Sequence, residues 1–321
     1  MSSPMLLAVP NVSEGRSGSA VEAIAQAFAP NLSPPETVAE HPRLLDVHSD
    51  ADHHRSVFTL AGRQGALADA LLAGARVAVE RIDVMNRSQS ERELAQHPHV
   101  GALDIVPIVY LDPGARGAAC AEALVVADRL AEELGLPVFL YGELTAGERH
   151  PARSRAQLRR GGVAALAQRM ASGRGEQEGA TTGLAPDFGP PRMHPTAGAA
   201  LVAARPPLVA FNLQLAPPAT LDEARRIAAL IREGGEEGLP GLRAIGVSLG
   251  GSVAQVSMNV ERPFDLPLAR VVEAVGRHAA IASAELVGLA PASALEGFPQ
   301  ELPMPGFDPA RHVIENALGS W

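Results

Sequence analysis

The chain contains no lysine, because all 27 of its basic residues are arginine. A catalytic Schiff base needs a lysine amine, and a nucleotide-binding P-loop needs a lysine beside the phosphates. Pyridoxal enzymes and P-loop ATPases are therefore excluded.

Cysteine and aromatic residues are also scarce. The one cysteine, Cys120, has no partner for an internal disulfide, and its alanine neighbours favour a packed thiol over a nucleophile. Aromatic residues make up 3% of the chain and hydrophobic residues 46%. A core built from Ala, Val, Leu and Ile is typical of buried sheets covered by alanine-rich helices, so we expect an α/β protein.

Long apolar runs are missing as well. No stretch reaches the roughly eighteen apolar residues that cross a bilayer, and residues 1–10 lack the features of a secretion signal. We therefore expect a cytoplasmic protein with no membrane partner. The net charge of −9 argues against a nucleic-acid partner, which needs a basic surface, but it leaves small anionic ligands open wherever arginines converge.

The 321 residues suggest two domains of about 150 residues each. Apolar patterns in the first half predict strands at residues 5–10, 44–47, 56–60, 105–111 and 137–141, and helices at 21–29, 65–82, 118–134 and 163–170. Glycine, proline and polar residues then dominate up to residue 190, so we place the domain junction there, with domains at 1–188 and 189–321.

The second half follows a βαββαβ order. Strands are predicted at 208–215, 242–249, 253–260 and 284–289, helices at 221–233 and 266–276, and a short helix near 309–318. This order is typical of the ferredoxin-like arrangement, in which two helices pack on one face of a sheet.

Histidine, the side chain best suited to proton transfer near neutral pH, is concentrated in two segments. The first is HSDADHHR at residues 48–55, and the second is QHPHVGALD at residues 96–104. Neither has the spacing of a known zinc motif, so a metal site is not favoured. From the residues alone, a solvated polar turn remains as good an interpretation as a catalytic site.

Several collinear motifs resemble the formiminotransferase domain found in glutamate formiminotransferases and in the bifunctional formiminotransferase-cyclodeaminases. They extend along nearly the whole chain and are VPNVSEGR at 9–16, DADHHRSV at 50–57, HPHVGALD at 97–104, EELGLPVFLYGE at 132–143, PDFGP at 186–190, AFN at 210–212 and AQVSMN at 254–259. Such a set is far more specific than any single short pattern.

The resemblance implies an α/β (α+β) fold of two ferredoxin-like subdomains with a ligand tunnel between them. It implies transfer of a formimino group from N-formimino-L-glutamate to tetrahydrofolate, the co-substrate, with His97 moving the proton. These small molecules are then the expected partners, and no metal is required. A homodimer is the assembly considered, although the sequence does not decide the oligomeric state.

The resemblance also suggests binding residues. Candidates for the substrate are Asn11, His54, Arg55 and His99, and Arg192 and Arg205 are further carboxylate clamps. The segment that follows PDFGP is the expected folate-binding stretch, made up of Gly189, Pro190, Pro191, Arg192, Met193, His194, Pro195, Thr196, Ala197 and Gly198.

Some positions depart from the family pattern. His99 stands where an arginine is usual, His54 where an asparagine is usual, and His48 where animal members have an acidic residue. The acidic segment GGEEG at 234–238 replaces a basic loop and would disfavour a folate polyglutamate tail. Two alternatives therefore stay open: a family member with another one-carbon donor or acceptor, and a noncatalytic folate-binding protein.

Overall fold

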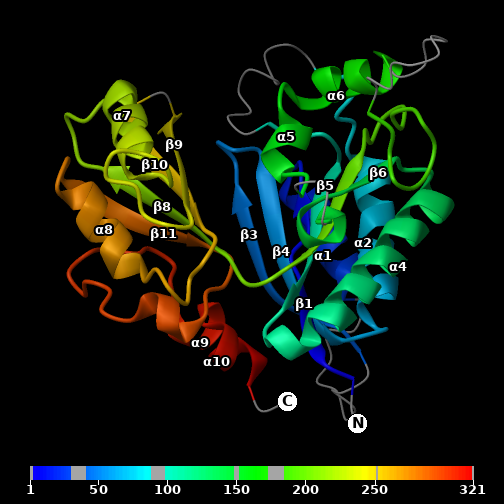
Figure 1. Ribbon diagram of the computed structural model, residues 1–321, viewed down its shortest axis with the longest axis horizontal. Coiled ribbons are helices and arrows are strands. Elements are labelled where there is room, and N and C mark those ends of the chain that lie inside the picture. Colours follow the sequence, from blue (N-terminus) through cyan, green and yellow to red (C-terminus); the bar gives the residue numbers. More distant parts are fainter. Residues whose placement is uncertain are drawn as a thin grey trace. The chain divides into compact units, whose positions relative to one another are not determined.

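A computed structural model describes residues 3–29, 41–87, 98–147, 152–172, 184–250 and 252–319. Its contacts divide the chain into an N-terminal unit, Met1–Pro206, and a C-terminal unit, Pro207–Trp321. Each unit has a sheet of its own (Figure 1), and each has its own hydrophobic core. In the described residues, no helix has the length and apolarity needed to cross a membrane.

The N-terminal unit is built on a mixed sheet of seven strands. Its first strands are β1 (Met5–Ala8), β2 (Asn11–Val12), β3 (Arg43–Asp50), β4 (Arg55–Arg63) and β5 (Leu103–Tyr110). Both β1 and β2 pair antiparallel with β4 on one side and β5 on the other, while β3 pairs with β4. With β1 and β2 taken as one interrupted strand, the order β3-β4-β1/β2-β5 is the ferredoxin-like order that the resemblance implies.

Three helices, α1 (Gly18–Phe28), α2 (Leu67–Arg81) and α4 (Arg116–Leu134), cover one face of this sheet and share its largest core cluster. The helix α1 begins earlier than the predicted range of 21–29, because the Ser17 side chain caps it by accepting a hydrogen bond from the backbone of Ala20. The start of α2 has no such cap of its own. The buried carboxylate of Glu122 on α4 accepts hydrogen bonds there from the backbone of Gly65 and Ala68, at 2.7 and 3.0 Å.

Two parallel strands extend the sheet beyond β5. They are β6 (Val138–Leu140), predicted from the sequence, and β7 (Ala200–Arg205), which was not predicted; β7 pairs with both β5 and β6. Because β7 belongs to this sheet, the units divide after Pro206 and not at the expected 188/189 junction. The short helix α5 (Arg155–Arg159) and the helix α6 (Gly162–Ala171) contribute, with β5, β6 and β7, to a separate apolar cluster.

The C-terminal unit has the predicted ferredoxin-like arrangement. Its strands are β8 (Val209–Leu215), β9 (Leu242–Leu249), β10 (Val253–Val260) and β11 (Ile281–Val287), paired antiparallel in the order β11-β8-β10-β9. The helices α7 (Leu221–Ile231) and α8 (Leu268–Gly276) share one core cluster with this sheet. The predicted helix near 309–318 is two short ones, α9 (Pro309–His312) and α10 (Ile314–Leu318).

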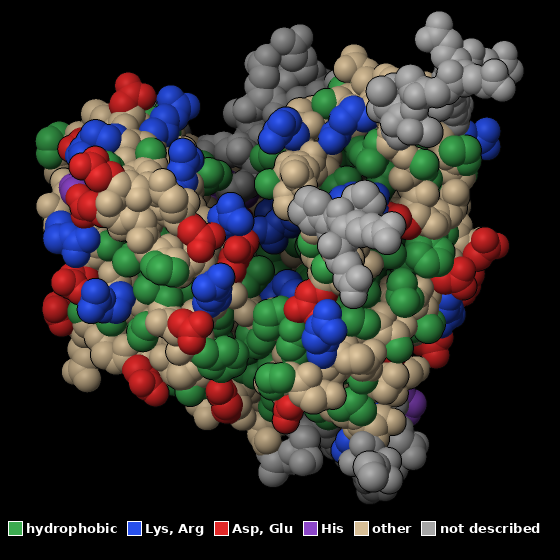
Figure 2. Space-filling view, in the orientation of Figure 1, with side chains coloured by type: hydrophobic (Ala, Val, Ile, Leu, Met, Phe, Trp, Pro, Cys, Tyr) green, Lys and Arg blue, Asp and Glu red, His purple; other side chains and the backbone are tan. Residues whose placement is uncertain are grey.

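Short 3-10 turns complete the fold: η1 (Pro113–Ala115), η2 (Gly142–Thr145) and η4 (Ala292–Leu295). Cys120 lies on α4, partly buried against the core, and burial raises the pKa of its thiol. A thiol that holds its proton is a poor nucleophile, in agreement with the packed role expected for it. On the face drawn in Figure 2, acidic and basic side chains are interspersed over each unit.

Candidate active site

Four segments of the N-terminal unit meet where β2 ends and where β4 and β5 begin. We call this region the strand-end site: residues 11–16, 50–55, 98–104 and 196–199. Ser13 joins two of the segments, because its backbone N–H donates to Ala102 O at 2.9 Å and its hydroxyl to Gly101 O at 2.7 Å. The Ser56 hydroxyl donates to Glu14 O at 2.6 Å and fixes a third segment.

A buried carboxylate lies at the base of the strand-end site. Asp104 is fully buried, and its Oδ1 accepts the backbone N–H of Val100 at 2.8 Å. Its Oδ2 accepts a hydrogen bond from Arg159 and lies 3.6 Å from Nη2 of Arg55. Two cations therefore share one anion. Burial, and next the charge of Arg159, lowers the pKa of Arg55 to about 9, although Asp104 acts in the opposite direction.

His54 occupies an unusual backbone conformation in the turn between β3 and β4. Its φ is 48°, in the left-handed region where Asn, Asp and His are the most frequent residues after glycine. Histidine is therefore among the residues that this turn position accommodates. Its Nδ1 accepts the backbone N–H of Gly15 at 3.2 Å and lies 3.4 Å from Oε1 of Glu14. The structure thus gives His54 a role in holding the turn, and β3 reaches further into the histidine segment than predicted.

Glu14 is the acidic residue of this turn. Burial alone would raise the pKa of its carboxyl, but the backbone N–H groups of Ser17 and Arg16, with the charges of His54 and Arg87, lower it. The two N–H groups donate to Oε1 at 2.9 and 2.8 Å. The ionised carboxylate of Glu14 therefore stabilises the connection between β2 and α1.

Glu14→Gln is expected to reduce the loss of stability in acid. A carboxyl whose pKa is lowered by folding stabilises the protein above its ordinary pKa of 4.5 and loses that contribution as the pH falls through its folded value. Urea unfolding at neutral pH and below 4.5 would measure the difference. Glu22→Gln, at an exposed position on α1, is the matched control; equal acid slopes for wild type and Glu14→Gln would contradict the assignment.

The expected catalytic residue, His97, lies outside the described residues. The segment that follows it is anchored in the site by the Val100 and Gly101 backbone contacts. His99 lies there with Nε2 3.4 Å from Nη1 of Arg87, and Nη2 of the same arginine donates to Ser13 O. Arg87, which no sequence motif singled out, thus lies beside His99. Asn11 lies buried on β2, between β4 and β5.

The expected folate-binding stretch ends against the segment that follows His97. Gly198 pairs with Gly101 across an isolated antiparallel bridge, and the backbone of His194 and Gly198 exchanges hydrogen bonds of 2.9 and 3.2 Å. The His194 ring closes the same turn, because Nδ1 accepts the N–H of Ala197 at 3.0 Å, and burial lowers the pKa of this ring. A neutral His194 is suited to accepting these backbone hydrogen bonds.

Gly101→Ala is expected to destabilise the protein by about 3 kcal/mol, because a Cβ at residue 101 would lie 1.8 Å from Ala199 O and force two backbones apart. Urea or thermal unfolding would measure the change. The matched control is Gly117→Ala on α4, where a Cβ meets nothing within 4 Å and helix propensity favours alanine by about 1 kcal/mol. Equal stability of Gly101→Ala and wild type would show that the bridge is not needed.

Two of the suggested arginines do not join this cluster. Arg205 ends β7 beside Val109, at the opposite end of β5 from the strand-end site, and Nη1 donates to Pro206 O at 3.0 Å. Arg192 is exposed. In the described residues, no group of three histidine, cysteine or acidic side chains is arranged to hold a metal ion.

The C-terminal sheet has a polar face, which we call the polar sheet face: Asn212, Gln214, Gln255, Ser257, Asn259 and Glu285. Strand pairing aligns them, with Asn212 opposite Ser257 and Glu285, while the alternate residues Phe211, Leu213 and Val256 pack in the core. Asn212 donates to Glu285 at 2.7 Å. Gln255 is fully buried, yet within the described part of the chain its amide oxygen and nitrogen have no hydrogen-bond partner.

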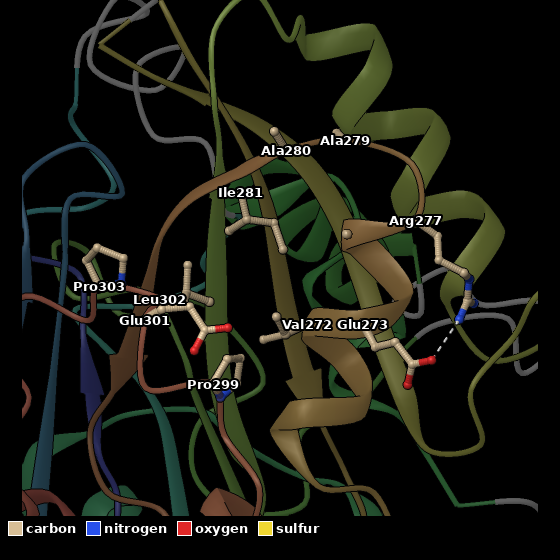
Figure 3. A pocket seen from close by; sticks show the side chains of 11 residues that line it. Val272, Glu273, Arg277, Ala279, Ala280, Ile281, Pro299, Glu301, Leu302 and Pro303 are labelled. Atoms are coloured by element: carbon tan, nitrogen blue, oxygen red, sulfur yellow. Dashed lines mark ion pairs between the residues drawn. The ribbon is translucent and has the colours of Figure 1, made fainter.

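A hollow of about 570 Å³ in the C-terminal unit lies among α8, the start of β11 and residues 299–303 (Figure 3). Val272, Ile281 and Leu302 line it, with Glu273 and Arg277 on its helical side. None of the residues expected to bind substrate or folate lines this hollow.

Comparisons with known proteins agree with the resemblance. Residues 5–205 match the formiminotransferase domain, N-terminal subdomain, and this match ends at the boundary between the units. The glutamate formimidoyltransferase of Streptococcus pyogenes is 33% identical over 317 residues, which cover 97% of each chain. The glutamate formimidoyltransferase of Thermoplasma acidophilum is 32% identical, over 89% of this chain and 88% of the relative.

The formimidoyltransferase-cyclodeaminase of Sus scrofa is 36% identical over 91% of this chain, which spans 51% of that longer relative. Among solved structures, a putative M16-like peptidase from Alicyclobacillus acidocaldarius has 13% identity and a TM-score of 0.18, over 86% of this chain and 73% of that chain; so weak a likeness bears on neither fold nor function. The sequence match over the N-terminal unit and the end-to-end similarity to the streptococcal enzyme establish that the chain belongs to the formiminotransferase family.

Proposed function

We propose that this chain is a glutamate formimidoyltransferase, which moves the formimino group of N-formimino-L-glutamate to tetrahydrofolate. The observation that carries the proposal is the similarity along 97% of both chains to a relative with that name. A partial match would leave the activity open, because it could reflect a shared fold alone.

The reaction needs two proton movements. Nitrogen N5 of tetrahydrofolate loses a proton as it attacks the amidine carbon, and the glutamate amine gains one as it leaves. A single imidazole can serve as base in the first step and acid in the second, and His97 is our candidate. No covalent enzyme intermediate is required. Holding the two substrates together can supply roughly 7–11 kcal/mol of the lowered barrier.

The strand-end site supports this assignment. The segment following His97 lies against the 196–199 turn, and Arg55, Arg87 and Arg159 bring guanidinium groups to this region, where they could pair with an acidic substrate. The residues of the polar sheet face are suited to a pterin, because a flat heterocycle carries hydrogen-bond donors and acceptors that the Gln255 amide and its neighbours could satisfy.

Steady-state assays of purified protein with tetrahydrofolate and a donor panel would test the proposal. We expect N-formimino-L-glutamate to have the highest kcat/KM among N-formimino-L-glutamate, N-formiminoglycine and N-formyl-L-glutamate. A preference for either of the others would favour the alternative of a changed one-carbon donor. Tight folate binding without turnover of any donor would favour a noncatalytic folate-binding protein.

A further inference from the structure

At the base of the strand-end site, two largely buried arginines contact the same oxygen of one buried carboxylate. Arg55 and Arg159 both approach Oδ2 of Asp104, so the two guanidinium groups are neighbours that share one negative charge. Only 9% of the Arg159 side chain and 18% of the Arg55 side chain are exposed. Charges so shielded from water are stable only when they are paired and hydrogen-bonded.

Each guanidinium also has a buried N–H group that makes no hydrogen bond. Within the described residues, Nε of Arg159 has no hydrogen-bond partner, and Nη2 of Arg55 faces Oδ2 of Asp104 at 3.6 Å, an ion-pair distance too long for a hydrogen bond. Buried donors in folded proteins are almost always satisfied, so two such donors on adjacent cations indicate a missing acceptor that is negatively charged. Burial and the charges of Arg159 and Arg155 lower the pKa of Arg55, while the carboxylates of Asp104 and Asp50 act in the opposite direction.

We propose that Arg159, together with Arg55, binds a carboxylate of a substrate glutamate group. This inference rests on the proposed function and assigns a binding role to a residue that neither the motifs nor the resemblance had indicated. A carboxylate fits because its two oxygens match the paired N–H groups of guanidinium side chains. Asp104 then acts as a positioning residue that holds both arginines while leaving one positive charge for the ligand.

The carboxylate has two chemical sources, the formiminoglutamate donor and the glutamate tail of the folate. In the Arg159→Gln variant we expect KM to rise about 10-fold to 100-fold for whichever substrate supplies it, the range for losing a charged hydrogen bond, with kcat changed by less than about threefold. If the arginines bind the side-chain carboxylate of the donor, Arg159→Gln should raise KM less for N-formimino-L-glutamine, which lacks that carboxylate, than for N-formimino-L-glutamate. If they bind the folate tail, the variant should not change KM for tetrahydropteroate, which has no glutamate.

The matched control is Arg160→Gln. Arg160 follows Arg159 directly but is exposed, so the variant loses the same formal charge without touching Asp104. We expect KM values within about twofold of wild type, because exposed charges contribute little. Arg159→Lys keeps the charge but not the planar guanidinium, so its KM should lie between those of wild type and Arg159→Gln. Circular dichroism would verify that the variants fold.

Binding of glutarate, a simple dicarboxylate, separates the two proposals because it needs no turnover. Calorimetry should give at least 10-fold weaker binding for Arg159→Gln than for Arg160→Gln. If wild type transfers the formimino group but the folded Arg159 variants change neither KM nor glutarate affinity, the inference is overturned and the proposed function stands. If glutarate binding depends on Arg159 and no donor is turned over, the carboxylate site stands and the proposed function fails.

Discussion

Replacing His97 by alanine is expected to lower turnover by about 100-fold to 10,000-fold, the range that positioned proton transfer contributes. The affinity for tetrahydrofolate should be nearly unchanged, because the imidazole is needed for the proton and not for holding the pterin. Steady-state kinetics and a separate folate titration would measure the two effects. Added imidazole should partly restore the activity of His97→Gly.

His41→Ala, at an exposed position, is the control for losing a histidine and should retain the wild-type rate. An unchanged rate for His97→Ala would show that His97 is not the proton-transfer residue. His99 would then be the next candidate, since it lies two residues further on and within 3.4 Å of Arg87.

Asp104→Asn is expected to destabilise the protein by about 3–5 kcal/mol, the range found when one partner of a buried ion pair is removed. The amide oxygen can still accept the Val100 N–H, but the amide NH2 group replaces the oxygen that accepts from Arg159, so the variant loses the charge and that hydrogen bond together. Arg55 and Arg159 would then be buried as adjacent cations without an anion. Urea unfolding, monitored by circular dichroism, would measure the loss.

Asp128→Asn, at an exposed position on α4, is the matched control and should stay within about 0.5 kcal/mol of wild type. If Asp104→Asn were as stable as this control, Asp104 would not be the anion that holds the two arginines. Dicarboxylate ligands should stabilise Asp104→Asn, because they would supply the charge that the variant lacks.

Much of the fold was predictable because local patterns and global arrangement agree. The C-terminal hairpin was predicted with its observed bounds at 242–249 and 253–260, and the order of elements led to the correct ferredoxin-like arrangement. The strand β7 was missed because its short run, residues 200–205, follows directly on a stretch rich in glycine and proline. The predicted domain junction was consequently too early.

The candidate site was only partly predictable. The motifs brought attention to Arg55, His54, His99 and the 189–198 stretch, but not to Arg159, which lies on the five-residue helix α5 without a helical period of its own. Arg159 forms an ion pair with Asp104, which is far from it in the sequence, so no local sequence pattern predicts this contact. The polar sheet face could have been predicted from the sequence, because polar and apolar residues alternate through Asn212, Gln214 and the AQVSMN motif.

The most direct measurement of the central claim follows the transferred atoms. N-formimino-L-glutamate would carry heavy carbon and heavy nitrogen in the formimino group, and mass spectrometry would examine both products after reaction with tetrahydrofolate. We predict that both labels appear together on the folate and that the released glutamate is unlabelled. Heavy carbon reaching the folate without the heavy nitrogen, or no label reaching it at all, would contradict formimino transfer.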